Sequence, residues 1–174
     1  MTIEPVYQEA LLSAAAYADW GIGDNPDTIL SEKGFTNSQI IQFKSDYTVE
    51  TFDKSDNGFA AVVFTNNFTG KKTVSFRGTE PTDLGDIVND VLLALGVQSL
   101  ADFFGFGQND SIESFLVAAG LVDTAGNSLV AANSVDFVGH SLGGHLAIVA
   151  AYKYFGLVEQ VSTFNGAGLQ AGHR

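Results

Sequence analysis

The chain has 174 residues, of which 45% are hydrophobic and 16% charged, and it contains 14 phenylalanines and no cysteine. This composition excludes a disordered tail, a charged coiled coil, a disulfide framework and thiol catalysis, and the length favours a single domain over residues 1–174. The net charge of −12 repels phosphate backbones and anionic lipid headgroups, so nucleic acid is not an expected partner.

The N-terminal segment is predicted to be an ordinary helix over residues 6–20, beginning after Pro5 and ending before Gly21. It carries Glu4 and Glu9 where a signal peptide needs positive charge, so no signal peptide is recognised. The longest apolar runs, "VLLALGV" and "LAIVAAY", are far shorter than the roughly 18–20 residues that span a bilayer, and no transmembrane segment is expected.

Three short β-branched and aromatic runs follow, at residues 47–52, 59–65 and 72–78. The segments between them, "DKSDNG" and "NNFTGK", have turn compositions. The pattern predicts an antiparallel meander.

Strands and helices alternate in the second half of the chain. Helices are predicted at 84–95, at 111–120 with Gly120 as its end, and at 142–156, and strands at 134–140 and 159–166. Strand–helix alternation from residue 72 onward implies a mainly parallel sheet with flanking helices and antiparallel strands at its N-terminal edge. The predicted fold class is α/β, similar to the α/β-hydrolases.

A serine in the pentapeptide Gly-His-Ser-Leu-Gly, residues 139–143, follows a predicted strand and precedes a predicted helix. In α/β-hydrolases the nucleophilic serine occupies a strained turn at such a junction, and small neighbours let the turn close. Gly139 and Gly143 supply that space, and the free N–H groups of the helix start favour an oxyanion. Ser141 is therefore predicted to be a nucleophile, and the alternative is a serine that only caps the helix.

A second motif, "RGT" at residues 77–79, lies about 60 residues before the serine. Together, "GHSLGG" and "VSFRGTEPTDLGDIVNDVLLALG" resemble the class 3 lipases, most of all secreted bacterial lipases whose catalytic domain precedes calcium-binding glycine-rich repeats. The resemblance spans about residues 59–168. It implies a carboxylic ester hydrolase that attacks lipid esters such as triacylglycerols through an acyl-enzyme, and it implies secretion.

The same resemblance implies an oxyanion hole formed by Thr79 and Leu142. Their N–H groups and the Thr79 hydroxyl would hold the developing charge, and losing one such donor typically costs about 3–4 kcal/mol. Asp90 resembles the family's helix aspartate, which accepts a bond from the hole residue; the alternative is a solvated carboxylate. Arg77 is expected to brace the loop through carboxylate or backbone bonds.

The general base and its orienting acid, which a serine nucleophile needs, are not found in this chain. His140 adjoins the serine and points elsewhere, and His145 lies one turn into the helix. His173 is the penultimate residue, with no Asp or Glu after Glu159. We therefore expect an incomplete lipase domain that has little activity alone.

No cofactor or metal site is predicted, although calcium stays open for the full-length protein. Residues 53–58 come closest to a calcium loop and are better explained as a turn. Residues 99–108, with three phenylalanines, are the candidate lid or lipid-contact segment, the alternative being core.

Two other functions fit the same sequence. A phospholipase A1 would share the site and differ in its lid and groove. A non-catalytic hydrolase-like binding module would explain the missing acid and base.

Overall fold

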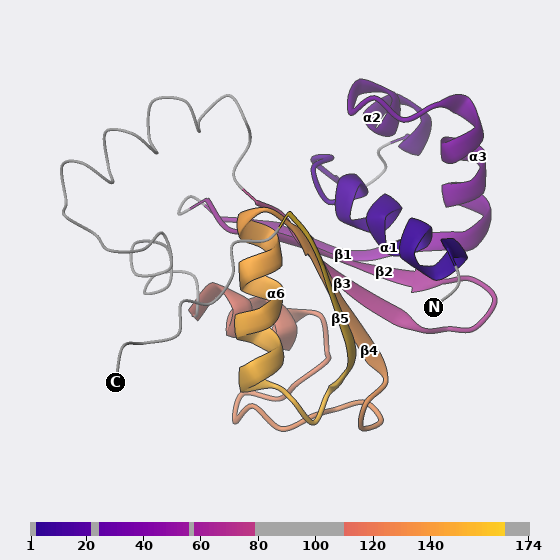
Figure 1. The fold of residues 1–174 in the computed structure, drawn as a ribbon. Coiled ribbons are helices and arrows are strands. Elements are labelled where there is room, and N and C mark those ends of the chain that lie inside the picture. The colour runs from indigo at the N-terminus through magenta and orange to yellow at the C-terminus, as the bar shows by residue number, and fades with distance from the viewer. Residues whose placement is uncertain (1–2, 22–24, 56–57, 79–109, 166–174) are drawn as a thin grey trace, which may run out of the picture.

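The computed structural model describes residues 3–21, 25–55, 58–78 and 110–165. A five-stranded mixed sheet with the order β1-β2-β3-β4-β5 forms its centre (Figure 1). The strands span Tyr47–Lys54 (β1), Ala60–Asn66 (β2), Lys72–Phe76 (β3), Val135–His140 (β4) and Val158–Phe164 (β5). Strands β1 to β3 pair antiparallel and β3 to β5 pair parallel, which confirms the predicted meander and the predicted parallel part of the sheet.

Helices cover both faces of this sheet. They span Ile3–Ala15 (α1), Pro26–Glu32 (α2), Asn37–Asp46 (α3) and Leu142–Lys153 (α6), and residues 110–118 are also helical. Figure 1 shows α1 on one side of the sheet and α6 on the other. Within the described ranges, no helix combines the length and the apolar character needed to cross a membrane.

Helix α1 differs from its prediction at both ends. It starts before Pro5, which is tolerated because the first turn of a helix does not need that N–H group. It stops at Ala15 rather than near Trp20, because the N–H groups of Tyr17 and Ala18 bond to carbonyls three residues back, each at 3.1 Å. The Trp20 indole Nε1 also donates to the Ala15 carbonyl at 3.0 Å. A side chain from beyond the helix therefore helps to satisfy its open end.

Helices α2 and α3 were not predicted, although each carries a start signal in the sequence. Asn25 caps α2 by accepting a hydrogen bond from the Asp27 N–H at 3.0 Å, with Pro26 in the first position. Thr36 and Gln39 form a capping box at the start of α3. The Asn-Pro dipeptide and the Thr-x-x-Gln spacing were the available signals.

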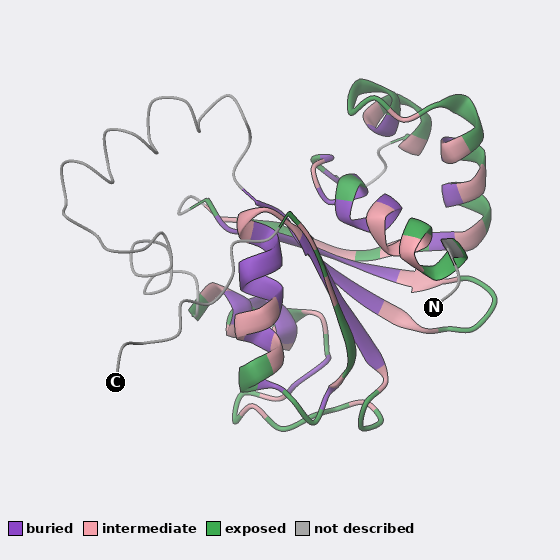
Figure 2. Cartoon of the chain, in the orientation of Figure 1, coloured by how far each residue is buried: buried purple, intermediate pink, exposed green. Residues whose placement is uncertain are grey.

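Two hydrophobic cores lie on opposite faces of the sheet, and β2 contributes to both. Ala61 and Val63 belong to the core beneath α6 and residues 110–118, whereas Val62 and Phe64 belong to the core beneath α1 and α3. The alternation follows from the period-2 geometry of a strand. Buried residues accordingly run along the central strands in Figure 2, which defines a three-layer α/β/α arrangement.

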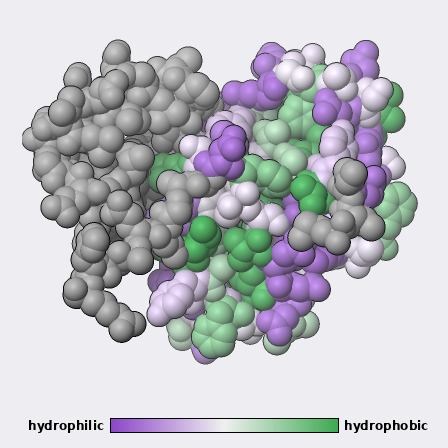
Figure 3. Space-filling model, viewed as in Figure 1, coloured by the Kyte–Doolittle hydropathy of each residue, from purple (hydrophilic) through white to green (hydrophobic). Residues whose placement is uncertain are grey.

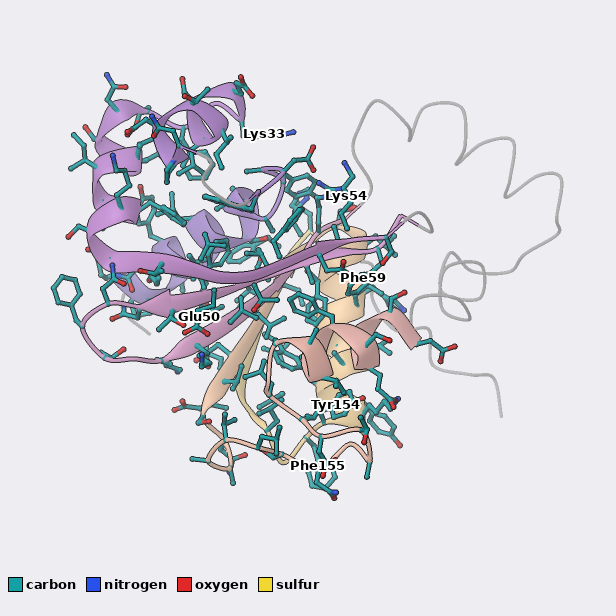
Figure 4. All side chains as sticks on the ribbon, turned by 180° about the vertical axis from the view of Figure 1, so that it is seen from behind. Lys33, Glu50, Lys54, Phe59, Tyr154 and Phe155 are labelled. Atoms are coloured by element: carbon teal, nitrogen blue, oxygen red, sulfur yellow. The ribbon has the colours of Figure 1, made fainter. Side chains whose placement is uncertain are left out.

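The core beneath α6 is built around aromatic rings. Phe59, labelled in Figure 4, packs edge-to-face against Phe115 with ring centroids 6.1 Å apart. Phe76 of β3 packs likewise on Phe137 of β4 at 5.5 Å. The Phe76–Phe137 contact thus joins β3 to β4 on this face of the sheet, and the Phe59–Phe115 contact joins the start of β2 to the helix at 110–118. Helix α6 also carries the half-buried apolar residues Ile148 and Val149, of which Val149 packs against this core, and hydrophobic side chains gather over the helix in Figure 3.

Candidate active site

Ser141 occupies the junction between β4 and α6, at the carboxyl edge of the parallel strands, where ligands commonly bind in α/β folds. Its backbone angles are φ 55° and ψ −124°, a conformation that costs a non-glycine residue on the order of 1–3 kcal/mol. The side chain is half-buried and makes no capping hydrogen bond to the helix. The alternative that Ser141 serves as a side-chain cap is therefore wrong.

Main-chain hydrogen bonds hold Ser141 in this strained conformation. Its N–H donates to the Phe164 carbonyl at the end of β5, at 2.9 Å. Its carbonyl accepts from the N–H groups of Gly144 at 3.0 Å and His145 at 3.4 Å. The backbone of Ser141 is thus hydrogen-bonded to the sheet and to the helix, whereas its hydroxyl makes no capping hydrogen bond.

The two glycines that flank Ser141 are required by close backbone approach. A Cβ atom on Gly139 would lie 2.2 Å from the Gly143 carbonyl oxygen. A Cβ atom on Gly143 would lie 2.1 Å from the Phe76 carbonyl oxygen of β3. Neither neighbour is a side chain that could move aside, so the predicted need for small residues around the turn is confirmed.

The loop that leaves β3 meets the first turn of α6. Gly78 is buried, and a Cβ atom there would lie 2.8 Å from the His140 carbonyl oxygen and 3.3 Å from the Gly143 nitrogen. The structure therefore brings Gly78, the residue before Thr79, against the turn that contains Ser141. Thr79 itself lies outside the described residues, so its part in an oxyanion hole stays a prediction.

Other predicted segments also fall outside the described residues. They are Asp90, the helix at 84–95 and the candidate lid at 99–108. Leu142, the other predicted hole residue, is the first residue of α6 and is half-buried. The first turn of α6 carries no acidic side chain, so the positive end of the helix dipole is unopposed there.

The two described histidines do not act as a paired base beside Ser141. The His140 Nδ1 lies 3.1 Å from the Tyr17 hydroxyl, so its partner is a phenol rather than a carboxylate. His145 is buried in α6 and only 4% exposed. His173 lies outside the described residues. Within the described part of the chain, no group of three or more His, Cys, Asp and Glu side chains could hold a metal ion.

Arg77, at the end of β3, has the carboxylate partner that the sequence suggested. Its guanidinium Nη1 lies 2.8 Å from Asp19 Oδ1, and its side chain is 6% exposed. Partial burial by itself would raise the pKa of Asp19, but hydrogen bonds and charge from Arg77 and Lys54 outweigh it and hold that pKa below its usual value. Asp19 is therefore ionised at neutral pH.

Sequence reasoning missed Tyr17 and Asp19 because the helix was expected to continue through them. Tyr17 is half-buried and Asp19 exposed, whereas Ala18 and Trp20 are buried. The alternation is one of burial and belongs to the structure, because "YADW" holds a single charged residue among aromatic and apolar ones and does not alternate in the sequence.

Two solved lipases resemble the structure. The lipase of Rhizopus microsporus var. chinensis is 17% identical, with a TM-score of 0.48, and the match covers 93% of this chain and 56% of that lipase. A fungal lipase in complex with an inhibitor is 16% identical, with a TM-score of 0.46, covering 89% of this chain and 57% of the other. The chain thus spans a little over half the length of each lipase. No curated protein sequence matches it.

A family model matches almost the whole chain. The Tle-like phospholipase domain, of the phospholipase-like group, aligns with residues 8–173. That range includes both halves of the candidate site, from Gly78 to Ser141. The chain belongs to the Tle-like phospholipase domain family.

Proposed function

We propose that Ser141 is the nucleophile of an esterase that cleaves acyl esters of phospholipids. The observation that carries the proposal is the strained backbone of Ser141, at φ 55° and ψ −124°, combined with a side chain that makes no capping bond at the start of α6. A fold keeps such strain where the surrounding structure over-determines it, commonly at functional sites. Its position between strand and helix matches the nucleophile elbow of α/β-hydrolases.

The proposed reaction runs through an acyl-enzyme. The Ser141 Oγ attacks the ester carbonyl carbon while its proton passes to a general base, and the carbonyl electron pair moves onto oxygen. The oxyanion would be held by the N–H groups of Leu142 and Thr79, with Asp90 orienting Thr79. Collapse expels the alcohol, which takes up the proton, and water then releases the fatty acid and restores Ser141.

The base and the acid are proposed to come from outside the described residues. His140 is engaged by Tyr17, and His145 is buried within α6. Histidine and carboxylate donated by other parts of the full-length protein would complete the site. This is the reason to test the full-length gene product.

Phospholipids are preferred over triacylglycerols as the proposed substrate because the chain belongs to a phospholipase-like family. The net charge of −12 disfavours approach to anionic surfaces, so zwitterionic phospholipids are the proposed form. The narrower resemblance, to secreted lipases with calcium-binding repeats, stays a prediction.

A fluorophosphonate probe tests the nucleophile directly in the full-length protein. We expect one labelled peptide, containing Ser141, and no labelling in Ser141→Ala. Ser134→Ala is the matched control, since Ser134 lies at the opposite end of β4 and bonds the Ala131 carbonyl at 2.7 Å. Labelling that survives Ser141→Ala would overturn the assignment, and no labelling of the wild type would favour the binding module.

Substrate choice is tested by fatty acid release from phosphatidylcholine vesicles, phosphatidylglycerol vesicles and triacylglycerol emulsions. We expect the zwitterionic phosphatidylcholine vesicles to be hydrolysed fastest at low salt. Faster release from the triacylglycerol emulsion would refute the phospholipid assignment and leave the ester hydrolase in place.

A further inference from the structure

We infer that residues 17–20, the segment that follows α1, position both sides of the proposed oxyanion hole. This inference rests on Ser141 being the nucleophile. One side of the proposed hole is the turn at Ser141, and the other is represented among the described residues by Gly78, which directly precedes Thr79. The 17–20 segment contacts both, although it lies more than a hundred residues from Ser141 in the sequence.

Tyr17 contacts the two sides through a single hydroxyl. That oxygen lies 3.1 Å from Nδ1 of His140, the residue before the nucleophile, and the two rings pack edge-to-face with centroids 6.0 Å apart. The same oxygen lies so close to Gly78 that a Cβ atom there would be 2.8 Å away. Moving Tyr17 would therefore alter the contacts of the nucleophile turn and of the β3 loop together.

Asp19 restrains the end of β3 through the side chain of Arg77. It accepts hydrogen bonds from Arg77 Nη1 at 2.8 Å and from Lys54 Nζ at 3.1 Å. Arg77 is 6% exposed and immediately precedes Gly78, so the ion pair restrains the backbone where the loop begins. Lys54, labelled in Figure 4, ties the same carboxylate to the end of β1.

The segment can act as a brace because its alternate residues are anchored in the core. Ala18 is fully buried, and Trp20 is 8% exposed. The Trp20 ring stacks on Phe43 with centroids 5.6 Å apart and meets Phe64 edge-to-face at 6.1 Å. Tyr17 and Asp19 are thus presented to the site from a fixed base rather than from a free loop.

A hole built from two segments needs their relative position to be held. Donors work when they are preorganised within about 0.5 Å of the productive geometry, and a displacement of about 1 Å can cost a hundredfold in rate. The 17–20 segment supplies such a restraint without touching the reacting atoms. Its residues are positioning residues, and their loss should lower kcat more than it changes KM.

The test uses Tyr17→Phe and Asp19→Asn in the full-length protein. The first removes the hydroxyl that contacts His140 and Gly78, and the second removes the charge that pairs with Arg77 and Lys54, each with little change in shape. Tyr152→Phe and Asp27→Asn are matched controls. Tyr152 is 88% exposed, and Asp27 forms a comparable exposed ion pair with Lys44 at 2.7 Å. The measurements are kcat and KM on phosphatidylcholine, the rate of fluorophosphonate labelling, and the urea midpoint.

We expect each test variant to lower kcat and the labelling rate by about tenfold, with KM within about twofold and the controls unchanged. We expect the double variant to lose less than the product of the two single losses, because both act on one geometry. Variants whose kcat matches the controls, or whose losses appear only in KM or in stability, would overturn the inference. If Ser141→Ala abolishes labelling in that same experiment, only the brace has failed; if labelling survives, the nucleophile assignment fails and the brace with it.

Discussion

Replacing Ser141 by glycine should remove activity and give a variant that is more stable than Ser141→Ala. The relevant comparison is with Ser141→Ala, because both variants lose the hydroxyl and only one keeps a Cβ atom. The backbone at φ 55° and ψ −124° is open to glycine and strained for alanine. Since the serine side chain makes no capping bond, neither variant loses a cap.

The size of the effect follows from two opposing contributions. Removing the strain returns on the order of 1–3 kcal/mol. Glycine gives back roughly 0.4–1 kcal/mol because it makes the unfolded chain more flexible. The midpoints of these two ranges, about 2 and about 0.7 kcal/mol, make Ser141→Gly about 1.3 kcal/mol more stable than Ser141→Ala. For a domain of this length, 1 kcal/mol corresponds to about 2–4 °C, so Tm should be higher by about 3–5 °C.

Urea unfolding and calorimetry measure the difference, and a second serine provides the reference. At Ser134, whose φ is not in the left-handed region, glycine should be less stable than alanine by roughly 0.4–1 kcal/mol. The two sites are thus expected to rank glycine and alanine in opposite orders. If Ser141→Gly were no more stable than Ser141→Ala, the strain argument for the nucleophile turn would be refuted.

Two further predictions concern packing and charge. Gly143→Ala should lower the free energy of unfolding by about 3 kcal/mol, because its Cβ atom would lie 2.1 Å from the Phe76 carbonyl oxygen. The control is Gly156→Ala, whose Cβ atom meets nothing within 4 Å and which should change the free energy of unfolding by less than about 1 kcal/mol. Equal urea midpoints for these variants would contradict the close approach of α6 to β3. Burial raises the pKa of Asp136 by more than Lys71 lowers it, so the Asp136 carboxyl holds its proton more tightly in the folded than in the unfolded protein. The contribution of this carboxyl to stability is therefore lost as pH rises through its folded-state pKa. Asp136→Asn lacks this loss, and its stability relative to wild type should increase from about pH 4 toward pH 7 in urea unfolding; a constant or decreasing difference would be the contrary result.

Local patterns in the sequence were enough to predict the strand and the helix on either side of Ser141. The alternation of the meander strands and the apolar run before Ser141 depend on neighbours a few residues apart, so they are readable without coordinates. The need for glycine at 139 has the same local origin, since a sharp strand-to-helix turn crowds its own backbone, whereas glycine at 143 is required by the distant Phe76 carbonyl of β3. The roles of Thr79 and Asp90 stay predictions.

Contacts between distant segments were decided only by the tertiary structure. The sequence predicted a helix through Trp20, yet α1 ends at Ala15, where an indole from beyond the helix bonds the last carbonyl. That early end places Tyr17 beside His140, 123 residues away, and Asp19 beside Arg77. No local period encodes such pairs, because they depend on how the helical layer docks on the sheet. The sequence thus determined that Ser141 stands between a strand and a helix, and packing determined what surrounds it.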